Sequence, residues 1–417
     1  MSFFSYFSKI KNKQLFSTDS LPLDILSGDF FNDPYPALKY LRQNDPLHRG
    51  KNGSWLLTRY DDVQQALANK ELGNAPSLYA VVHYKNSEKY SCADVANNIL
   101  PFIDPPEHTV KRDIISKSFF HIVKQFLNDD DAQHIAYRIA GNCKKETVFD
   151  VIHDFGTPFS TEIMCRLIGF PVEDKLKLAY WSELFLYLFS SIPDNKTLDK
   201  VNSALDAFRQ YTITQISKKS IASGGNWAGS LITYNSTNSS PLNENEIIDN
   251  IMLLFVDGVE NVDRMLGTCI KLLHDHPEQR EQLINDLTKL DSFIDECLRY
   301  ESPVQFISRI ARDNLVIHDQ LIRKDSAVLL MLGSANRDDA KFSDPDSFQY
   351  ERDNRATLTF GRGTHTCLGR TLVRHQLKTA LLVLLEYFPD FSLADKTPYW
   401  EKRLAHRWLK SMKIKHN

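Results

Sequence analysis

Cys367 stands in a glycine-rich stretch whose residue types suit metal chemistry, Phe360-Gly361-Arg362-Gly363-Thr364-His365-Thr366-Cys367-Leu368-Gly369-Arg370. No second cysteine lies two to four residues away, so the spacing is a poor fit to a structural zinc site. Glycine permits a positive φ and lets a flat ligand approach the backbone. An apolar helix is predicted to follow, over residues 372–385. The backbone N–H groups at the start of a helix point at a cysteine that precedes it, which favours the thiolate form of that cysteine. The loop could therefore hold one soft metal from one side, and a buried structural cysteine is the alternative interpretation.

A second chemically unusual stretch lies inside a long predicted helix, residues 247–274. Asn243 can cap this helix, with Glu246 in the third position of a capping box. Six apolar residues, 251–256, are followed by two acids, a glycine and an amide, namely Asp257, Gly258, Glu260 and Asn261. Acidic side chains after an apolar run are costly if they are buried. They either turn toward water or serve a chemical purpose.

Glu296 and Arg299 lie three residues apart, so they share one face of a predicted helix. An exposed pair of this kind contributes little to stability. Here the neighbouring Cys297 and Leu298 are apolar, and Pro303 ends the helix soon afterwards. The apolar flanks favour a buried pair over a solvated one.

The composition points to one large α-rich protein without a strong charge preference. The 417 residues are 42% hydrophobic, and the net charge of −3 gives no strong attraction to nucleic acid or anionic lipid. Asp61 and Asp62 are predicted to cap a helix over 63–69. Most of the chain has helical periodicity, and strands or hairpins are predicted over residues 55–60, 315–322 and 327–332. The predicted fold class is mainly α with small β-sheets, without the strand–helix alternation of a dinucleotide-binding domain.

Residues 1–20 are expected to form an N-terminal arm, and residues 21–417 to form a single domain. No apolar run reaches 18 residues and no signal-peptide pattern is present, so we expect a cytoplasmic protein without a transmembrane segment. The six cysteines show no paired spacing, which is typical of a reducing compartment. Residues 77–100 are expected to be irregular, and residues 220–243 to form a surface loop around a short helix.

The motifs, taken together, resemble one known family. The chain is similar to the cytochrome P450 haem-thiolate monooxygenases, in particular their soluble bacterial members, from Trp55 to Leu384. The match to the family's haem-binding signature is carried by Phe360, Gly361, Gly363, His365, Cys367 and Gly369. Glu296 and Arg299 match its Glu-x-x-Arg element, and Arg352 stands where that element's third member is expected. The resemblance implies the P450 fold, with a haem between a long distal helix and a proximal cysteine loop.

The resemblance implies haem b as the cofactor, with its iron ligated by Cys367. Two propionates of haem need neutralising donors, and arginine suits carboxylates because its charge is permanent and its geometry bidentate. The cofactor-binding residues implied by the family positions are His108, Arg112, Arg309, His365, Phe360, Gly361 and Gly369. For His108 taken alone, an ordinary histidine at a helix end remains the alternative.

On the distal helix, the resemblance implies catalytic roles for Asp257, Glu260 and Asn261. Glu260 takes the position of the acid that passes protons inward, and Gly258 would make room for oxygen. Most family members have threonine where this chain has Asn261, and an amide is a poor proton relay. An ordered water, a substrate hydroxyl or Asp257 could replace the missing alcohol. Alternatively, the enzyme could run peroxide-driven oxidation, desaturation or carbon–carbon cleavage.

The implied activity is oxygen-dependent oxidation of a largely apolar small molecule, such as a secondary metabolite. Pocket walls are expected in 77–100, 184–189, 254–261 and 304–307. Electrons are expected from a separate ferredoxin-like or flavodoxin-like donor, and the protein is expected to act as a monomer without nucleic acid. A basic patch for that donor is expected from Lys111, Arg112, Lys117, Arg362, Arg370, Arg374 and Lys378. A haem sensor without turnover is a further alternative.

Overall fold

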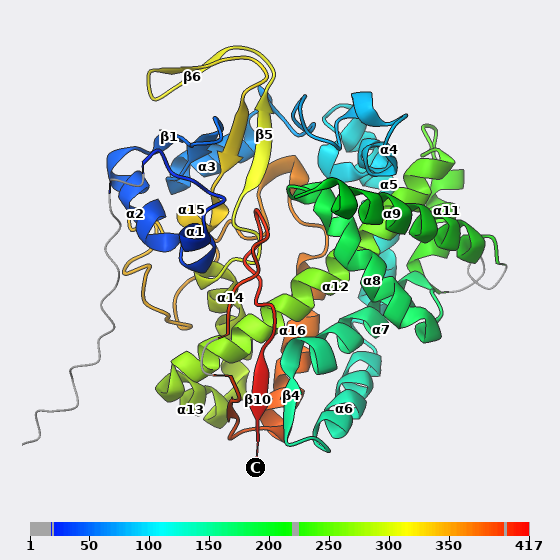
Figure 1. The fold of residues 1–417 in the computed structure, drawn as a ribbon. Coiled ribbons are helices and arrows are strands. Elements are labelled where there is room, and N and C mark those ends of the chain that lie inside the picture. The colour runs from blue at the N-terminus through cyan, green and yellow to red at the C-terminus, as the bar shows by residue number, and fades with distance from the viewer. Residues whose placement is uncertain (1–17, 19–20, 219–224, 396–397, 417) are drawn as a thin grey trace, which may run out of the picture.

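The computed structural model describes residues 18, 21–218, 225–395 and 398–416. A sheet-bearing part with β1, β5, α2 and α3 lies on one side and a larger helical part on the other, and α12 runs between them across the molecule (Figure 1). The principal helices are α2 (Tyr35–Asn44), α3 (Tyr60–Ala68), α4 (Ser91–Asn98), α5 (Glu107–Phe126), α6 (Asp131–Cys143), α7 (Thr157–Ile168), α8 (Lys175–Phe185), α9 (Asn195–Ile216), α11 (Trp227–Ser236), α12 (Glu244–Asp275), α13 (Pro277–Asn285), α14 (Leu290–Tyr300) and α16 (Arg370–Tyr387). The predicted class, mainly α with small β-sheets, is confirmed.

The largest sheet has five strands in the order β1-β2-β8-β5-β3, with β2 and β8 parallel and the other neighbours antiparallel. These strands are β1 (Leu47–Arg49), β2 (Trp55–Leu57), β8 (Ala327–Leu330), β5 (Ile307–Ala311) and β3 (Leu72–Gly73). A three-stranded sheet joins β4 (Val148–Asp150), β10 (Lys413–Lys415) and β9 (Ser392–Leu393), and β6 (Leu315–Ile317) pairs with β7 (Gln320–Ile322). The predicted strands and the predicted hairpin are therefore present.

Helix α12 forms because a capping box fixes its start and an apolar stripe binds it into the core. The Asn243 side chain accepts from the Glu246 backbone N–H at 3.0 Å, and the Glu246 carboxylate accepts from the Asn243 N–H at 2.8 Å. The helix packs against α7, α8 and α16, and most of its apolar residues are buried. This burial positions its middle, around Asp257, above the loop that carries Cys367.

Two local expectations were wrong. Helix α3 begins at Tyr60, so Asp61 and Asp62 lie in its first turn, and the Tyr60 N–H is capped from far away by the Asp338 carboxylate at 2.7 Å. Residues 91–98 form α4, whose apolar side chains pack against α9 and α12.

Between residues 220 and 243, the expected short helix is present as α11, and it is anchored in the core. The Trp227 indole is fully buried and donates to Ser118 on α5 at 3.0 Å. Residues 220–224 of the expected loop lie outside the described residues, as does the expected N-terminal arm apart from residue 18. None of the described helices is long and apolar enough to cross a membrane.

Candidate active site

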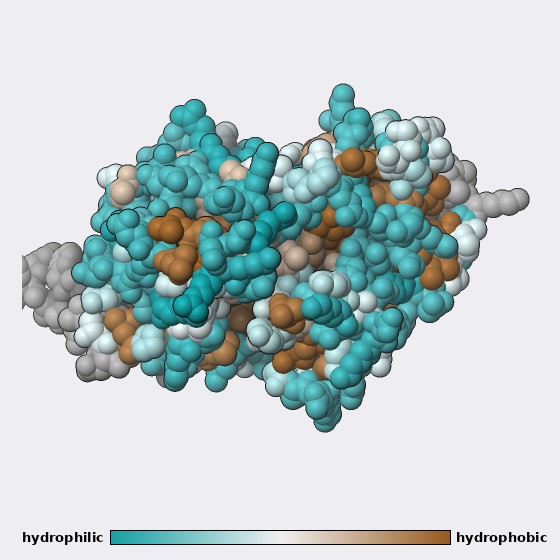
Figure 2. Space-filling model, turned by 90° about the horizontal axis from the view of Figure 1, so that it is seen from above, coloured by the Kyte–Doolittle hydropathy of each residue, from teal (hydrophilic) through white to brown (hydrophobic). Residues whose placement is uncertain are grey.

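One cavity of about 750 Å³ lies between α12 and the Cys367 loop, and mostly apolar side chains line it. Seen from above, the surface is hollowed between the two parts of the molecule, and apolar side chains show within the hollow (Figure 2). Every residue predicted for the site lines this cavity except Glu260. Each of the predicted pocket walls contributes as well, through residues such as Val81, Phe189, Leu254 and Val304.

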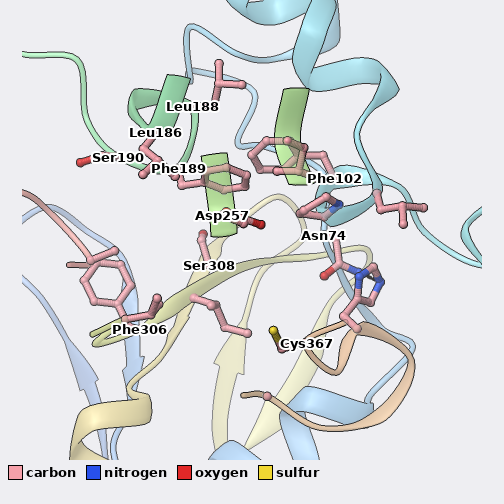
Figure 3. A pocket seen from close by; sticks show the side chains of 18 of the residues that line it. Asn74, Phe102, Leu186, Leu188, Phe189, Ser190, Asp257, Phe306, Ser308 and Cys367 are labelled. Atoms are coloured by element: carbon pink, nitrogen blue, oxygen red, sulfur yellow. Dashed lines mark hydrogen bonds between the residues drawn. The ribbon is translucent and has the colours of Figure 1, made fainter. Parts of the chain in front are cut away.

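The Cys367 sulfur faces the cavity from the loop before α16 (Figure 3). The loop is folded by the Cys367 N–H, which donates to the Phe360 carbonyl at 2.8 Å, and by positive φ angles of 66° at Gly361 and 77° at Gly363. A Cβ added to Gly369 would lie only 4.0 Å from the Cys367 sulfur, so glycine keeps this side of the thiol open. Of the six cysteines, all of which are described, Cys367 alone lines the cavity.

The pKa of the Cys367 thiol is raised overall, because burial outweighs the nearby hydrogen-bond donors. Burial raises its pKa to about 11, and the backbone N–H groups of Gly369 and Arg370 act in the opposite direction. A coordinated metal ion deprotonates a thiol outright. Among the described residues, no group of three or more His, Cys, Asp and Glu could hold a metal ion. A metal in this cavity would therefore take a single protein ligand, on the loop side.

The nitrogen donors beside the loop fit a flat ligand that brings its own negative charges. His108 is 1% exposed and neither of its ring nitrogens has a partner, while its ring stacks on His365 with centroids 3.9 Å apart. Neither Arg112 nor Arg309 forms an ion pair within the described part of the chain. Arg309 donates only to a backbone carbonyl, and burial lowers its pKa to about 10. Buried donors without acceptors are costly, so this group suits the two propionates of a haem.

Below the loop, the Glu296–Arg299 pair is fully buried and fully hydrogen-bonded. Arg299 makes two parallel bonds of 2.7 Å to the Glu296 carboxylate, and neither side chain is exposed. Its remaining N–H groups donate to carbonyls of the 336–347 segment. Arg352 joins the pair, with its Nε 3.5 Å from Glu296 Oε1. The predicted buried triad is therefore present, and it ties α14 to the segment that leads to Cys367.

On the opposite wall, Leu254, Asp257 and Asn261 form one face of α12 that lines the cavity. Asp257 projects from α12 into the open space near Phe189 (Figure 3). Gly258 also borders the cavity, but a Cβ there would lie 2.3 Å from the Met164 sulfur of α7. The close packing of α7 on α12 thus explains why residue 258 is glycine, the residue that the family resemblance expected to make room for oxygen.

Glu260 lies behind the cavity wall, in a buried cluster of charges. It is 2% exposed, and its carboxylate lies 3.8 Å from Arg264, which is also 3.8 Å from the Glu401 carboxylate. Asp263 accepts from the Thr157 hydroxyl at 2.6 Å. Burial and Asp263 raise the pKa of Glu260 to about 8. Glu401, 24% exposed in its side chain, connects this cluster to the surface.

Several residues of the site escaped the sequence. The Asn74 amide lies 3.0 Å from the His365 ring nitrogen and donates to Asp104, which also binds Arg312. Phe102 stacks on Phe189, a residue of the expected 184–189 wall, with 5.2 Å between ring centroids in the upper wall. Ser190, Ser308 and the segment 404–406 also line the cavity. Asn74, Ser190 and 404–406 lie in irregular segments without a recognisable pattern, and Ser308 lies on β5, so no local signal marked them.

Comparison with known proteins decides the family. The family model described as Cytochrome P450 matches residues 177–399. The chain belongs to the cytochrome P450 family. It is 29% identical over 414 residues to a cytochrome P450 of Bacillus subtilis, covering 98% of this chain and 99% of the relative.

Two further relatives agree in sequence and fold. The polyketide biosynthesis cytochrome P450 PksS of Bacillus subtilis is 27% identical and covers 93% of this chain and 96% of the relative. The crystal structure of P450BioI in complex with hexadec-9Z-enoic acid ligated acyl carrier protein aligns with a TM-score of 0.85 at 26% identity, over 93% of this chain and 99% of the other. This P450 is therefore a haem-binding monooxygenase of the class whose iron is held by a cysteine thiolate.

Proposed function

We propose that this P450 oxidises a largely apolar small molecule inside the cavity, with Cys367 as the iron ligand and with electrons from a separate ferredoxin-like or flavodoxin-like donor. The observation that carries the proposal is the Cys367 sulfur, which opens into an apolar cavity bounded by α12. Relatives are named for biotin and polyketide biosynthesis. These names favour a specialised metabolite as the substrate.

The loop side of the cavity holds the cofactor. Bound haem supplies oxygen activation, which the thiolate ligand promotes. Arg112 and Arg309 neutralise the propionates, and His108 and His365 donate to them as neutral rings because burial lowers the pKa of each to about 4 and about 3. Phe360, Gly361 and Gly369 keep the backbone close to the flat ring.

On the α12 side, Glu260 holds the proton that the reaction consumes. A carboxyl group with a pKa near 8 is protonated at neutral pH and can release that proton inward. Glu401 and Arg264 connect it to the surface, so a lost proton is replaced from solvent. Asn261, one turn of helix from Asp257, faces the cavity and orients water there through its amide.

The test is the reduced carbon monoxide difference spectrum of the wild type, of Cys367→Ser and of Cys143→Ser. Wild type and Cys143→Ser are expected to give the spectrum of a thiolate-ligated haem, because Cys143 is buried away from the cavity. Cys367→Ser is expected to lose it. A thiolate spectrum in Cys367→Ser would contradict the assignment of the ligand.

A second candidate function is peroxide-driven or otherwise atypical oxidation, and Asn261 favours it. Its Oδ1 atom is buried without a partner, and its amide replaces the alcohol usual in the family. The test compares turnover with peroxide alone against turnover with a ferredoxin system. Faster turnover with peroxide favours this second function. In the ferredoxin system, Asn261→Thr is expected to change the fraction of reducing equivalents that reach product. An unchanged fraction would remove Asn261 from proton delivery.

The basic surface proposed for docking the electron donor is smaller than the predicted patch of seven lysines and arginines. Lys117, Arg374 and Lys378 pair with Asp113, Asp295 and Asp291 at 2.7, 2.5 and 2.6 Å. Lys111 pairs with Glu107 and Glu246, and Arg112 turns inward to the Thr366 carbonyl. The exposed Arg362 and Arg370 are left as the centre of the proposed surface.

A further inference from the structure

The wall of the cavity formed by α12 carries two polar side chains that face the open space. Leu254, Asp257 and Asn261 are spaced three and four residues apart, so they share one face of the helix. They are partly exposed to the cavity, whereas Val256 and Val259 on other faces are buried. Asp257 and Asn261 stand one turn apart, close enough for one ligand group to touch both.

Neither polar group of this pair is satisfied by the protein. Within the described residues, no hydrogen bond or ion pair reaches the side chain of Asp257 or Asn261, and Asn261 Oδ1 is buried and unpaired. Burial alone raises the pKa of Asp257 to about 7, and no neighbouring cation acts in the opposite direction. A desolvated polar group without a partner is costly, and a ligand that supplies the missing hydrogen bonds recovers that cost.

The distribution of charge around the cavity specifies the kind of ligand group. The arginines that line the cavity, Arg112 and Arg309, belong to the set beside the Cys367 loop, which suits the propionates. The surroundings of Asp257 are apolar, with the stacked Phe102 and Phe189 in the adjoining wall. An anionic ligand group at this place would meet a second carboxyl group without a cation between them. A donor group would meet an acceptor that has no other donor.

We propose that Asp257 and Asn261 form a recognition site for one hydrogen-bond donor, a hydroxyl or a protonated amine, on an otherwise apolar substrate, and that this site disfavours a free carboxylate. The inference rests on the proposed function, because it names the substrate class of the same cavity. A hydroxyl donates to Asp257 while accepting from the Asn261 amide, and a protonated amine donates to the Asp257 carboxylate. Asp257 is thus a specificity-determining residue.

The test compares four probes with the same ten-carbon chain and different ends. Decan-1-ol and protonated N,N-dimethyldecylamine carry a donor, decyl methyl ether carries none, and decanoate carries a negative charge. Binding to the haem-loaded protein is measured by calorimetry, with the absorbance change of the haem as a second readout. Wild type is expected to bind at least one donor probe about fivefold or more tightly than the ether, as one net hydrogen bond implies.

Three variants assign the preference to Asp257. Asp257→Leu is expected to bring the donor probes and the ether within about twofold of each other and to tighten decanoate. Asp257→Asn is expected to weaken binding of the amine probe more than binding of the alcohol probe. It removes the negative charge that the amine needs but keeps an acceptor for the alcohol. Leu254→Val is the matched control, since it changes the volume of the same helix face but not its polarity, and it is expected to keep the preference.

Several results would overturn the inference. They are equal binding of ether and donor probes by wild type, an unchanged order in Asp257→Leu, or no binding of either donor probe. The carbon monoxide difference spectrum of each preparation separates this failure from failure of the proposed function. A normal thiolate spectrum without the preference defeats only the inference. An absent thiolate spectrum in wild type defeats the proposed function.

Discussion

The loop side and the α12 side of the cavity both bury charged groups, but they satisfy them differently. Below the loop, the Glu296 carboxylate receives two bonds from Arg299 and one from the Gln349 N–H at 2.8 Å. On α12, the nearest ion pairs of Glu260 and Asp263 are 3.8 and 3.7 Å long, and one oxygen of each carboxyl has no partner. The loop side is built to be rigid, whereas the α12 side retains groups that a proton or a substrate can satisfy.

The largest effect is expected from breaking the complete network. Glu296→Ala leaves Arg299 buried and unpaired, which costs about 3–5 kcal/mol. We expect little haem-loaded protein, measured as the ratio of haem to protein and as the melting temperature. The matched control is Lys378→Ala, which removes an exposed pair between α14, the helix that carries Glu296, and α16, and costs at most about 1 kcal/mol. Normal haem content in Glu296→Ala would contradict the structural role.

A smaller effect is expected where the loop side meets the cofactor. His108→Leu removes a buried donor that has no partner in the protein, so its cost appears only in haem binding. A hydrogen bond to a charged group contributes about 1.5–3 kcal/mol, which corresponds to haem affinity weaker by roughly 10- to 100-fold. Haem transfer to a competing acceptor protein measures this. His121→Leu, at an exposed position of the same helix, is expected to leave the affinity unchanged.

The incompletely hydrogen-bonded Glu260 carboxyl on α12 is expected to make the free energy of unfolding depend on pH. Because the native pKa of Glu260 is raised from 4.5 to about 8, the native state keeps a proton that the unfolded chain has released over that range. The free energy of unfolding therefore falls as pH rises from about 4.5 to about 8. Glu260→Gln removes this contribution, so its melting temperature relative to wild type is expected to be higher at pH 8 than at pH 5. If the difference in melting temperature between Glu260→Gln and wild type is the same at pH 5 and pH 8, the pKa of Glu260 is not raised in the native state.

The smallest effect concerns the outer surface of the loop side. Arg370→Glu is expected to slow reduction by an acidic ferredoxin several-fold at low salt, and the loss should shrink as salt screens the charges. Stopped-flow reduction of the haem measures the rate. Lys196→Glu, an exposed position on α9, is the matched control and is expected to have little effect. Equal reduction rates for Arg370→Glu and Lys196→Glu at low salt would show that the electron donor does not dock at Arg370.

The sequence by itself determined the features that depend on short spacing. The loop around Cys367, the capping box at Asn243 and the Glu296–Arg299 pair are each carried by residues within ten positions of one another, so their types and order predict their geometry. The fold class and the helices α12, α14 and α16 followed from periodicity for the same reason. The start of α3 did not, because its cap comes from Asp338, far along the chain.

Only the tertiary structure decided which of these groups find partners. It turned Glu260 away from the cavity and toward Arg264, and it brought Asn74 to His365. It also paired four of the seven expected patch cations with acids, three of them on other helices, and left Asp257 without a cation. Whether a polar side chain is satisfied depends on segments that are distant in the chain and meet only when the core packs. That is why Cys367 could be recognised from its neighbours, while the character of the wall opposite it could not.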